Sequence, residues 1–232
     1  MTKTMPHTAS LSMQTPIISA SILGADLAHL ARDCRAAIDA GANALHIDVM
    51  DHHYVPNLTF GADVCKALTN AKLDCFIDVH LMVDTPENYI KPFADAGAHL
   101  ITFHPSTAKD PNKLIDDITG YGMQAGLAFN PDEKVSISNT ILKKLDLILV
   151  MSVFPGFCGQ SFMPEVLNKF QPLIEQCNAI DKPLHLAIDG GINLTTINKA
   201  YQAGANYFVI GSGLFGADNI CARIKQLHQA CM

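Results

Sequence analysis

The chain has 232 residues, of which 49% are hydrophobic and 16% charged, and its formal net charge is −6. The negative net charge and the lack of any run of Lys or Arg disfavour nucleic acid and anionic membrane surfaces as partners. The low share of charged residues leaves a thin polar surface, which predicts a homo-oligomer. The seven cysteines are scattered, no apolar run reaches the roughly 18 residues of a membrane span, and no signal-peptide pattern opens the chain, so we expect a cytoplasmic protein.

Eight short apolar runs follow a polar stretch over residues 1–15, which we expect to be a flexible tail. Nearly continuous apolar runs are typical of parallel strands that are covered on their outer face. In chain order, the predicted strands are Ile17–Ala20, Ala44–Val49, Cys75–Leu81, His99–Phe103, Gln124–Phe129, Leu145–Met151, Leu184–Ile188 and Asn206–Ile210.

Helical patterns occupy the intervals between these runs, with apolar residues recurring three and four positions apart. The stripe of the first helix consists of Leu27, Leu30, Ala31, Cys34 and Ile38. The stripe of the last helix consists of Ile220, Ile224, Leu227 and Cys231.

An Ala-Gly-Ala triplet stands between a helix and a strand three times, around Gly41, Gly97 and Gly204, where Gly suits a left-handed helix end. The spacing fits a strand-helix unit of about 27 or 28 residues repeated eight times. The pattern therefore predicts a (β/α)8 TIM barrel that forms a single catalytic domain over residues 16–232. The competing interpretation is an open doubly wound sheet, which the lack of a G-x-G-x-x-G sequence at the first helix disfavours.

Imidazoles and carboxylates gather at the carboxyl ends of three predicted strands. Side-chain alternation puts His46 and Asp48 on one face of the second strand, His80 near the end of the third, and Asp189 after the seventh. Each alone is more simply a core His or a capping Asp, but together they suit one Zn²⁺, Fe²⁺ or Mn²⁺ ion with open positions for a chelating substrate. We expect Asp78, one pleat deeper than His80, to support the site from behind.

Methionines and glycines stand at the same ends of the strands. We expect Met50, Met82 and Met151 to form an apolar cap over the metal, although Met is more often a filler of cores. Glycine-rich loops follow the last three strands, and their backbone N–H groups can converge on a phosphate, although tight turns need Gly in any case. The residues predicted there are Gly156, Phe157, Cys158, Gly159, Gly190, Gly191, Gly211 and Ser212.

Together these motifs resemble the ribulose-phosphate 3-epimerase family across essentially everything after the tail. The segment that begins at His46 and the Gly-Gln-Ser-Phe loop are the most specific part of the likeness. The matching segments are Ile18–Ser21, His46–Asp51, Val55–Asn57, Asp78–Met82, Ile101–Pro105, Pro155–Phe157, Gly159–Phe162 and Asp189–Ile192.

The resemblance implies an epimerase that converts D-ribulose 5-phosphate to D-xylulose 5-phosphate at C3, in the pentose phosphate pathway. It implies one divalent metal ion per subunit, held by four residues that also include the acid and the base: His46, Asp48, His80 and Asp189. Asp48 and Asp189 would transfer the proton by a two-base route through a metal-stabilised enediolate, with a small sugar phosphate as the partner molecule. Ser19 would contact the substrate or order the site, and His80 would also face the substrate.

Three residues depart from the family pattern, namely His52 and Cys158 where Gly is usual and Phe154 where Asn is usual. These departures concern loop geometry and affinity more than reaction type. We assign no role to His104 or His185.

Two alternative functions stay open. One is epimerisation of another ketose phosphate such as D-allulose 6-phosphate, and the other is a non-catalytic barrel that binds a phosphosugar. A Schiff-base aldolase is disfavoured because no Lys stands at a predicted strand end. The decarboxylase and hexulose-phosphate synthase relatives of this barrel are disfavoured because Asp48 has no Lys two positions further on.

Overall fold

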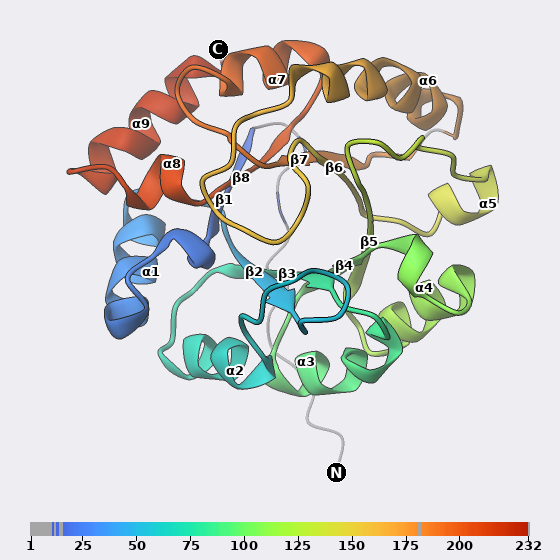
Figure 1. Ribbon diagram of the computed structural model, residues 1–232, viewed down its shortest axis with the longest axis horizontal. Helices are drawn as coiled ribbons and strands as arrows, with labels where there is room; N and C mark the ends of the chain where they lie inside the picture. Colours follow the sequence, from blue (N-terminus) through green and yellow to red (C-terminus); the bar gives the residue numbers. More distant parts are fainter. Residues whose placement is uncertain (1–10, 12, 14–15, 181, 232) are drawn as a thin grey trace.

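A computed structural model describes residues 11, 13, 16–180 and 182–231 of the chain. Apart from residues 11 and 13, the tail predicted over residues 1–15 lies outside the described residues. Within the described part, eight parallel strands close into a barrel in chain order, and helices surround it (Figure 1). The predicted (β/α)8 barrel is therefore confirmed.

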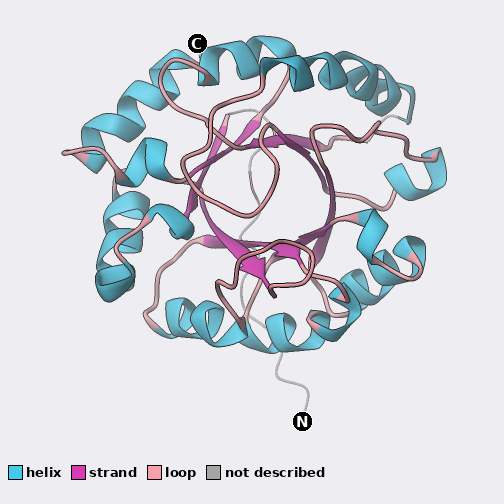
Figure 2. Ribbon diagram, in the orientation of Figure 1, coloured by secondary structure: helices cyan, strands magenta, loops and turns pink. Residues whose placement is uncertain are grey.

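The strands form the central ring that Figure 2 draws in magenta. Each begins and ends within two residues of the run that predicted it. Their bounds are β1 Ile17–Ser21, β2 Ala44–Met50, β3 Phe76–Met82, β4 Leu100–Phe103, β5 Gln124–Phe129, β6 Leu147–Met151, β7 His185–Asp189 and β8 Tyr207–Ile210.

The outer layer consists of α-helices and short 3-10 turns. The helices are α1 Leu30–Asp39, α2 Ala62–Asn70, α3 Ile90–Ala96, α4 Pro111–Gly120, α5 Asn139–Leu142, α6 Phe170–Ile180, α7 Ile197–Ala203, α8 Ser212–Phe215 and α9 Ile220–Ala230. The 3-10 turns are η1 Ile22–Gly24, η2 Leu27–His29, η3 Pro86–Asn88, η4 Pro105–Thr107 and η5 Pro164–Lys169. Among the described residues, no helix is both long and apolar enough to span a membrane.

Both faces of the strands are buried, which explains their continuous apolar sequences. Outward-facing side chains such as Ile47 and Val79 pack in a large core that also includes helix residues. Inward-facing side chains such as Phe76, Leu100 and Tyr207 fill the barrel itself. Because the interior is packed, the rim at the carboxyl ends of the strands is the place for a pocket.

Strand register brings the polar residues to that rim. In the β2–β3 pair, Asp48 lies opposite His80, and His46 lies opposite Asp78 one pleat deeper. Asp189 is the last residue of β7, so it reaches the same end of the barrel. The alignment follows from parallel pairing, in which neighbouring strands end at the same edge.

The glycine helix ends are confirmed, because Gly41, Gly97 and Gly204 all have positive φ, at 108°, 92° and 110°. The stripe of the last helix is also confirmed in part, since Ile224 and Leu227 are fully buried in the core.

The stripe predicted for the first helix is too long. Leu27 is 58% exposed and lies in η2, and α1 begins only at Leu30. The carboxylate of Asp26 accepts a hydrogen bond from the N–H of Ala28 and caps a separate 3-10 turn. The helical period therefore starts three residues later than the apolar pattern indicated.

Candidate active site

Four side chains from three strands converge at the rim of the barrel. His46 and Asp48 come from β2, His80 from β3 and Asp189 from β7, and one ligand atom of each lies within 4.8 Å of the others. Two buried imidazole nitrogens, Nε2 of His46 and Nδ1 of His80, have no hydrogen-bond partner among the described residues. Buried polar atoms are costly when unpaired, so these atoms fit a bound cation. The group could therefore hold a metal ion.

A carboxylate behind His46 orients its ring. Nδ1 of His46 lies 2.7 Å from Oδ2 of Asp78, and the hydroxyl of Tyr207 donates to the same oxygen at 2.8 Å. With Nδ1–H directed at a carboxylate, Nε2 keeps its lone pair for the metal. The expected support from Asp78 is therefore present, and Tyr207 adds a contact that the sequence patterns did not reveal.

His80 has a different neighbour behind it. Its Nε2 lies 3.0 Å from Nε2 of His104, and its Nδ1 lies 3.4 Å from Oδ1 of Asp48. His104 received no role from the sequence, although it directly follows β4 and therefore stands at the same edge as the four ligand candidates. That position was the signal that could have identified it.

The two site carboxyls have pKa values displaced in opposite directions in the metal-free protein. Burial, together with the charge of Asp48, raises the pKa of Asp189 to about 7. Burial also acts to raise the pKa of Asp48, but the neighbouring His46 and His80 outweigh it and hold this pKa below its usual value. For His46, burial is outweighed by Asp78 and Asp48, so its pKa lies well above the usual value. The opposite displacement of the pKa values of Asp48 and Asp189 is typical of an acid and base pair.

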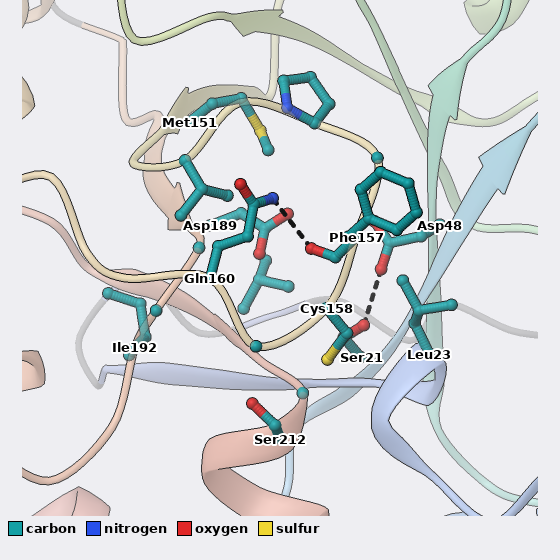
Figure 3. Close-up of a pocket in the computed structure, with 18 of the residues that line it drawn as sticks. Ser21, Leu23, Asp48, Met151, Phe157, Cys158, Gln160, Asp189, Ile192 and Ser212 are labelled. Atoms are coloured by element: carbon teal, nitrogen blue, oxygen red, sulfur yellow. Dashed lines mark hydrogen bonds between the residues drawn. The ribbon is translucent and has the colours of Figure 1, made fainter. Parts of the chain in front are cut away.

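A cavity of about 250 Å³ opens above these residues (Figure 3). Asp48 and Asp189 line it, whereas His46 and His80 lie behind its wall, so His80 does not face the cavity as the resemblance implied. The structure brings all the predicted cap and phosphate-loop residues to this pocket: Met50, Met82, Met151, Gly156, Phe157, Cys158, Gly159, Gly190, Gly191, Gly211 and Ser212. It also adds residues that were not singled out as site residues, among them Ser21, Leu23, Gln160, Ile192 and Asn193.

Ser21, and not the predicted Ser19, is the β1 residue at the pocket. Its hydroxyl donates to Oδ2 of Asp48 at 2.7 Å, a contact drawn in Figure 3. Ser19 is fully buried and does not line the cavity. Both side chains point into the barrel, because they are two residues apart on one strand. Ser21 pairs in register with His46, whereas Ser19 pairs with Ala44 and so lies one pleat deeper.

The loop after β2, residues 51–61, and the loop after β6, residues 152–163, meet at the mouth of the pocket and are called the β2 loop and the β6 loop below. The side-chain amide of Asn57 donates to the carbonyl of Gly156 at 2.8 Å. Within the β6 loop, the amide of Gln160 donates to the carbonyls of Phe154 and Phe157. These contacts tie the loop that carries the predicted phosphate residues to the strand that carries Asp48.

The loop after β7 packs closely under the β6 loop. Gly191 has a φ of 62°, and a Cβ there would lie 2.6 Å from the backbone nitrogen of Phe162. A side chain at this position would therefore push the two loops apart. Gly suits the position because it allows both the left-handed backbone and the close approach.

The three departures from the family pattern differ in their position. His52 has a φ of 62°, a left-handed conformation that favours Gly. Phe154 is 49% exposed and does not line the cavity, so it replaces no substrate-facing group. Cys158 is exposed and lines the cavity, and its sulfur lies beside Gly211.

Comparison with known proteins agrees with this geometry. The model of the Ribulose-phosphate 3 epimerase family matches residues 17–215. The Ribulose-phosphate 3-epimerase of Buchnera aphidicola subsp. Schizaphis graminum is 44% identical over 217 residues, which cover 94% of this chain and 95% of the relative. The enzyme of the same name from Escherichia coli K12 is 43% identical, with 88% and 90% covered.

Solved structures with low identity show the same fold. KGPDC from Streptococcus mutans is 17% identical with a TM-score of 0.63, and 94% of this chain and 98% of that chain are covered. The 3-hexulose-6-phosphate synthase of Salmonella typhimurium is 14% identical with a TM-score of 0.62, with 94% and 98% covered. At these identities the likeness supports the barrel alone.

Proposed function

The chain belongs to the ribulose-phosphate 3-epimerase family. We propose that Asp48 and Asp189 are the two groups that remove and return the proton at C3 of the substrate. The enzyme is an isomerase that interconverts D-ribulose 5-phosphate and D-xylulose 5-phosphate, a step of the pentose phosphate pathway. The relatives that carry this name match the chain over most of its length, which disfavours a non-catalytic barrel.

The observation that carries the residue assignment is the pair of carboxyls in one pocket. Inversion at C3 requires one group to remove a proton from one face of the sugar and another to return a proton to the opposite face. Asp48 and Asp189 come from β2 and β7, which are not neighbours in the barrel, and both line the same cavity. In the metal-free protein, the opposite displacements of their pKa values favour one ionised and one protonated carboxyl. Which one acts first depends on the direction of the reaction.

We propose one divalent ion per subunit, Zn²⁺, Fe²⁺ or Mn²⁺, with His46, Asp48, His80 and Asp189 as ligands. The support is the close approach of the four ligand atoms and the two unpaired imidazole nitrogens. When bound, such an ion supplies Lewis-acid stabilisation of the negative charge that develops on the sugar oxygens.

The remaining pocket residues bind the substrate and exclude water. Met50, Met82 and Met151 present an apolar wall without hydrogen-bond donors, which shields the reacting carbon from solvent protons. We assign the phosphate to the loops after β6, β7 and β8, where the glycine-rich backbone lines the cavity. Ser21 takes the place of Ser19 as the β1 residue that orders the site, since it donates to Asp48.

The composition supports a proposal about the cellular setting. We propose a cytoplasmic homo-oligomer whose single catalytic domain spans residues 16–232 and whose partner is a small sugar phosphate. The scattered cysteines favour a reducing compartment, and the low charged fraction of 16% favours a buried subunit interface. The net charge of −6 disfavours nucleic acid. Light scattering coupled to gel filtration would measure the oligomeric state, and a monomer would contradict that part of the proposal.

The decisive experiment replaces each carboxyl by its amide. We expect Asp48→Asn and Asp189→Asn to lower turnover by roughly 100- to 10,000-fold, the usual contribution of a general acid or base. A coupled assay with ribulose 5-phosphate measures the rate, and deuterium uptake at C3 reports proton removal directly. Asp95→Asn is the control, because Asp95 is exposed on α3 and pairs with the exposed Lys91. Near wild-type turnover in either site variant would refute the two-base assignment.

Substrate choice needs a separate comparison. The wild-type enzyme should have a higher kcat/KM for D-ribulose 5-phosphate than for D-allulose 6-phosphate or an unphosphorylated ketose. A higher kcat/KM for the six-carbon phosphate would move the physiological substrate to the alternative ketose while leaving the reaction type unchanged.

A further inference from the structure

A second buried imidazole lies behind the metal-ligand candidate His80 and takes no part in the proton transfer proposed above. His104 is fully buried, and its ring centroid lies 5.1 Å from that of His80. Their Nε2 atoms are 3.0 Å apart, which is hydrogen-bond distance. An imidazole therefore stands behind His80 where the carboxylate of Asp78 stands behind His46.

The chemistry of two facing imidazoles leaves two arrangements of the bond. In a neutral imidazole one nitrogen carries hydrogen and the other has a free lone pair, so one Nε2 must donate and the other accept. If His80 donates, its Nδ1 keeps a lone pair beside Asp48 and can bind a metal. If His104 donates, Nδ1 of His80 carries the hydrogen and directs it at Oδ1 of Asp48, 3.4 Å away, which prevents metal binding.

The surroundings hold the His104 ring in place. The Tyr54 ring packs against it with centroids 4.8 Å apart, and the Tyr54 hydroxyl accepts from the amide of Asn130 at 2.7 Å. The carbonyl of His104 accepts from the backbone N–H and the hydroxyl of Thr107, which closes η4 directly after the histidine. Nδ1 of His104 has no partner among the described residues in either arrangement, so it does not favour one of them.

We propose that His104 is a positioning residue that accepts the Nε2–H bond of His80 and thereby keeps Nδ1 of His80 available as a metal ligand. This role rests on the metal site of the proposed function. It differs from direct catalysis, because His104 does not line the substrate cavity and lies behind the ligand.

The first test compares two variants of His104 by calorimetric titration of the metal-free protein with Zn²⁺. His104→Phe keeps a ring against Tyr54 but has no acceptor, and we expect Zn²⁺ affinity to fall roughly 10- to 100-fold, as for other groups that orient metal ligands. His104→Gln retains an acceptor oxygen at similar reach and should stay within a few-fold of wild type. Circular dichroism and thermal unfolding of the metal-free variants check the fold.

The second test needs no variant. In the Zn²⁺-loaded wild-type enzyme, nitrogen NMR of the histidine rings should show hydrogen on Nε2 of His80 and none on Nε2 of His104. Hydrogen on Nε2 of His104, or wild-type Zn²⁺ affinity in His104→Phe, would overturn the proposed role alone. Failure of the wild-type protein to bind Zn²⁺, Fe²⁺ or Mn²⁺ would instead overturn the metal site, and the role of His104 with it.

Discussion

At the scale of single residues, the hydrogen bond from Ser21 to Asp48 matters because its acceptor is a buried carboxylate. Hydrogen bonds to charged groups contribute about 1.5–3 kcal/mol, more than bonds between neutral groups. The 2.7 Å contact also limits the orientations open to Asp48, whose other oxygen faces His46 and His80. Ser21 therefore helps to set the orientation of the Asp48 carboxylate in the pocket.

Removal of the Ser21 hydroxyl should lower kcat/KM. We expect Ser21→Ala to lower kcat/KM by roughly 10- to 100-fold, which corresponds to the loss of one charge-assisted bond. Steady-state kinetics with ribulose 5-phosphate provides the measurement. Ser19→Ala is the matched control from the same strand, and it should change kcat/KM little because Ser19 does not reach the cavity. A large loss in the control with none in Ser21→Ala would reverse the assignment.

Cys158 is a pocket residue that a thiol reagent can modify. Its thiol is exposed and lines the cavity beside Gly211, whereas Cys221 is exposed on α9 and lines no part of this pocket. We expect iodoacetamide to alkylate Cys158. The attached group would fill the proposed phosphate end of the pocket and so inactivate the enzyme. Inorganic phosphate should slow the inactivation in proportion to its occupancy of the site.

The matched variants separate the two thiols. Cys158→Gly should stay active and resist iodoacetamide, while Cys221→Ala should be inactivated as fast as wild type, with residual activity measured over time. Inactivation of Cys158→Gly at the wild-type rate would show that another residue is responsible.

At the scale of elements, the β2 loop is shaped by the carboxylate that begins it. Asp51 pairs with Leu58 in an antiparallel bridge, and its side chain accepts from the N–H groups of His53, Tyr54 and Asp84. These bonds force a sharp bend right after Asp51, which explains why the next residue has a left-handed backbone.

The left-handed residue is His52, and its strain should be measurable. For a residue with a Cβ, this conformation costs about 1–2 kcal/mol, and a β-branched side chain suffers most. We expect His52→Val to lower the free energy of unfolding by about 1–2 kcal/mol and His52→Gly to leave it unchanged or raise it by up to about 1 kcal/mol. Urea unfolding followed by circular dichroism gives these values. The neighbouring His53→Val should change stability by less than about 0.5 kcal/mol, and an equal effect at both positions would argue against backbone strain.

At the scale of the whole molecule, the proposed metal site joins parts of the barrel that are distant along the chain. Its ligands come from β2, β3 and β7, so a bound ion would hold the two halves of the ring together at their carboxyl ends. Since this site is assembled only by folding, metal binding would stabilise the folded state over the unfolded chain.

The stabilisation can be predicted from mass action. Zn²⁺ at about 100 times its dissociation constant should add about 2.7 kcal/mol to the free energy of unfolding. For a domain of this size, that corresponds to a rise of roughly 5–10 °C in the unfolding temperature, measurable by differential scanning fluorimetry. His80→Ala should abolish the shift, whereas His53→Ala should preserve it, because His53 is an exposed loop residue. A shift that survives in His80→Ala would place the stabilising ion elsewhere.

The fold and the set of residues at the rim could be predicted because they depend on local pattern. Runs such as Leu147–Met151 are buried on both faces and so are continuously apolar. Gly97 ends its helix with a left-handed residue, which depends on the local backbone and not on how the helix packs. The prediction failed at Leu27, where a side-chain cap on Asp26 interrupted the period. Capping of this kind competes with apolar periodicity and is hard to weigh from sequence.

By itself, the sequence determined that this protein is a TIM barrel with imidazoles and carboxylates at the carboxyl ends of β2, β3 and β7, because alternation and parallel pairing act locally. Only the tertiary structure decided that Ser21 rather than Ser19 meets Asp48, that His104 lies behind His80, and that Asn57 bonds to Gly156 across the mouth. The physical reason is that these contacts depend on the depth of each residue along the barrel and on the approach of strands and loops far apart in the chain. No local pattern encodes those distances.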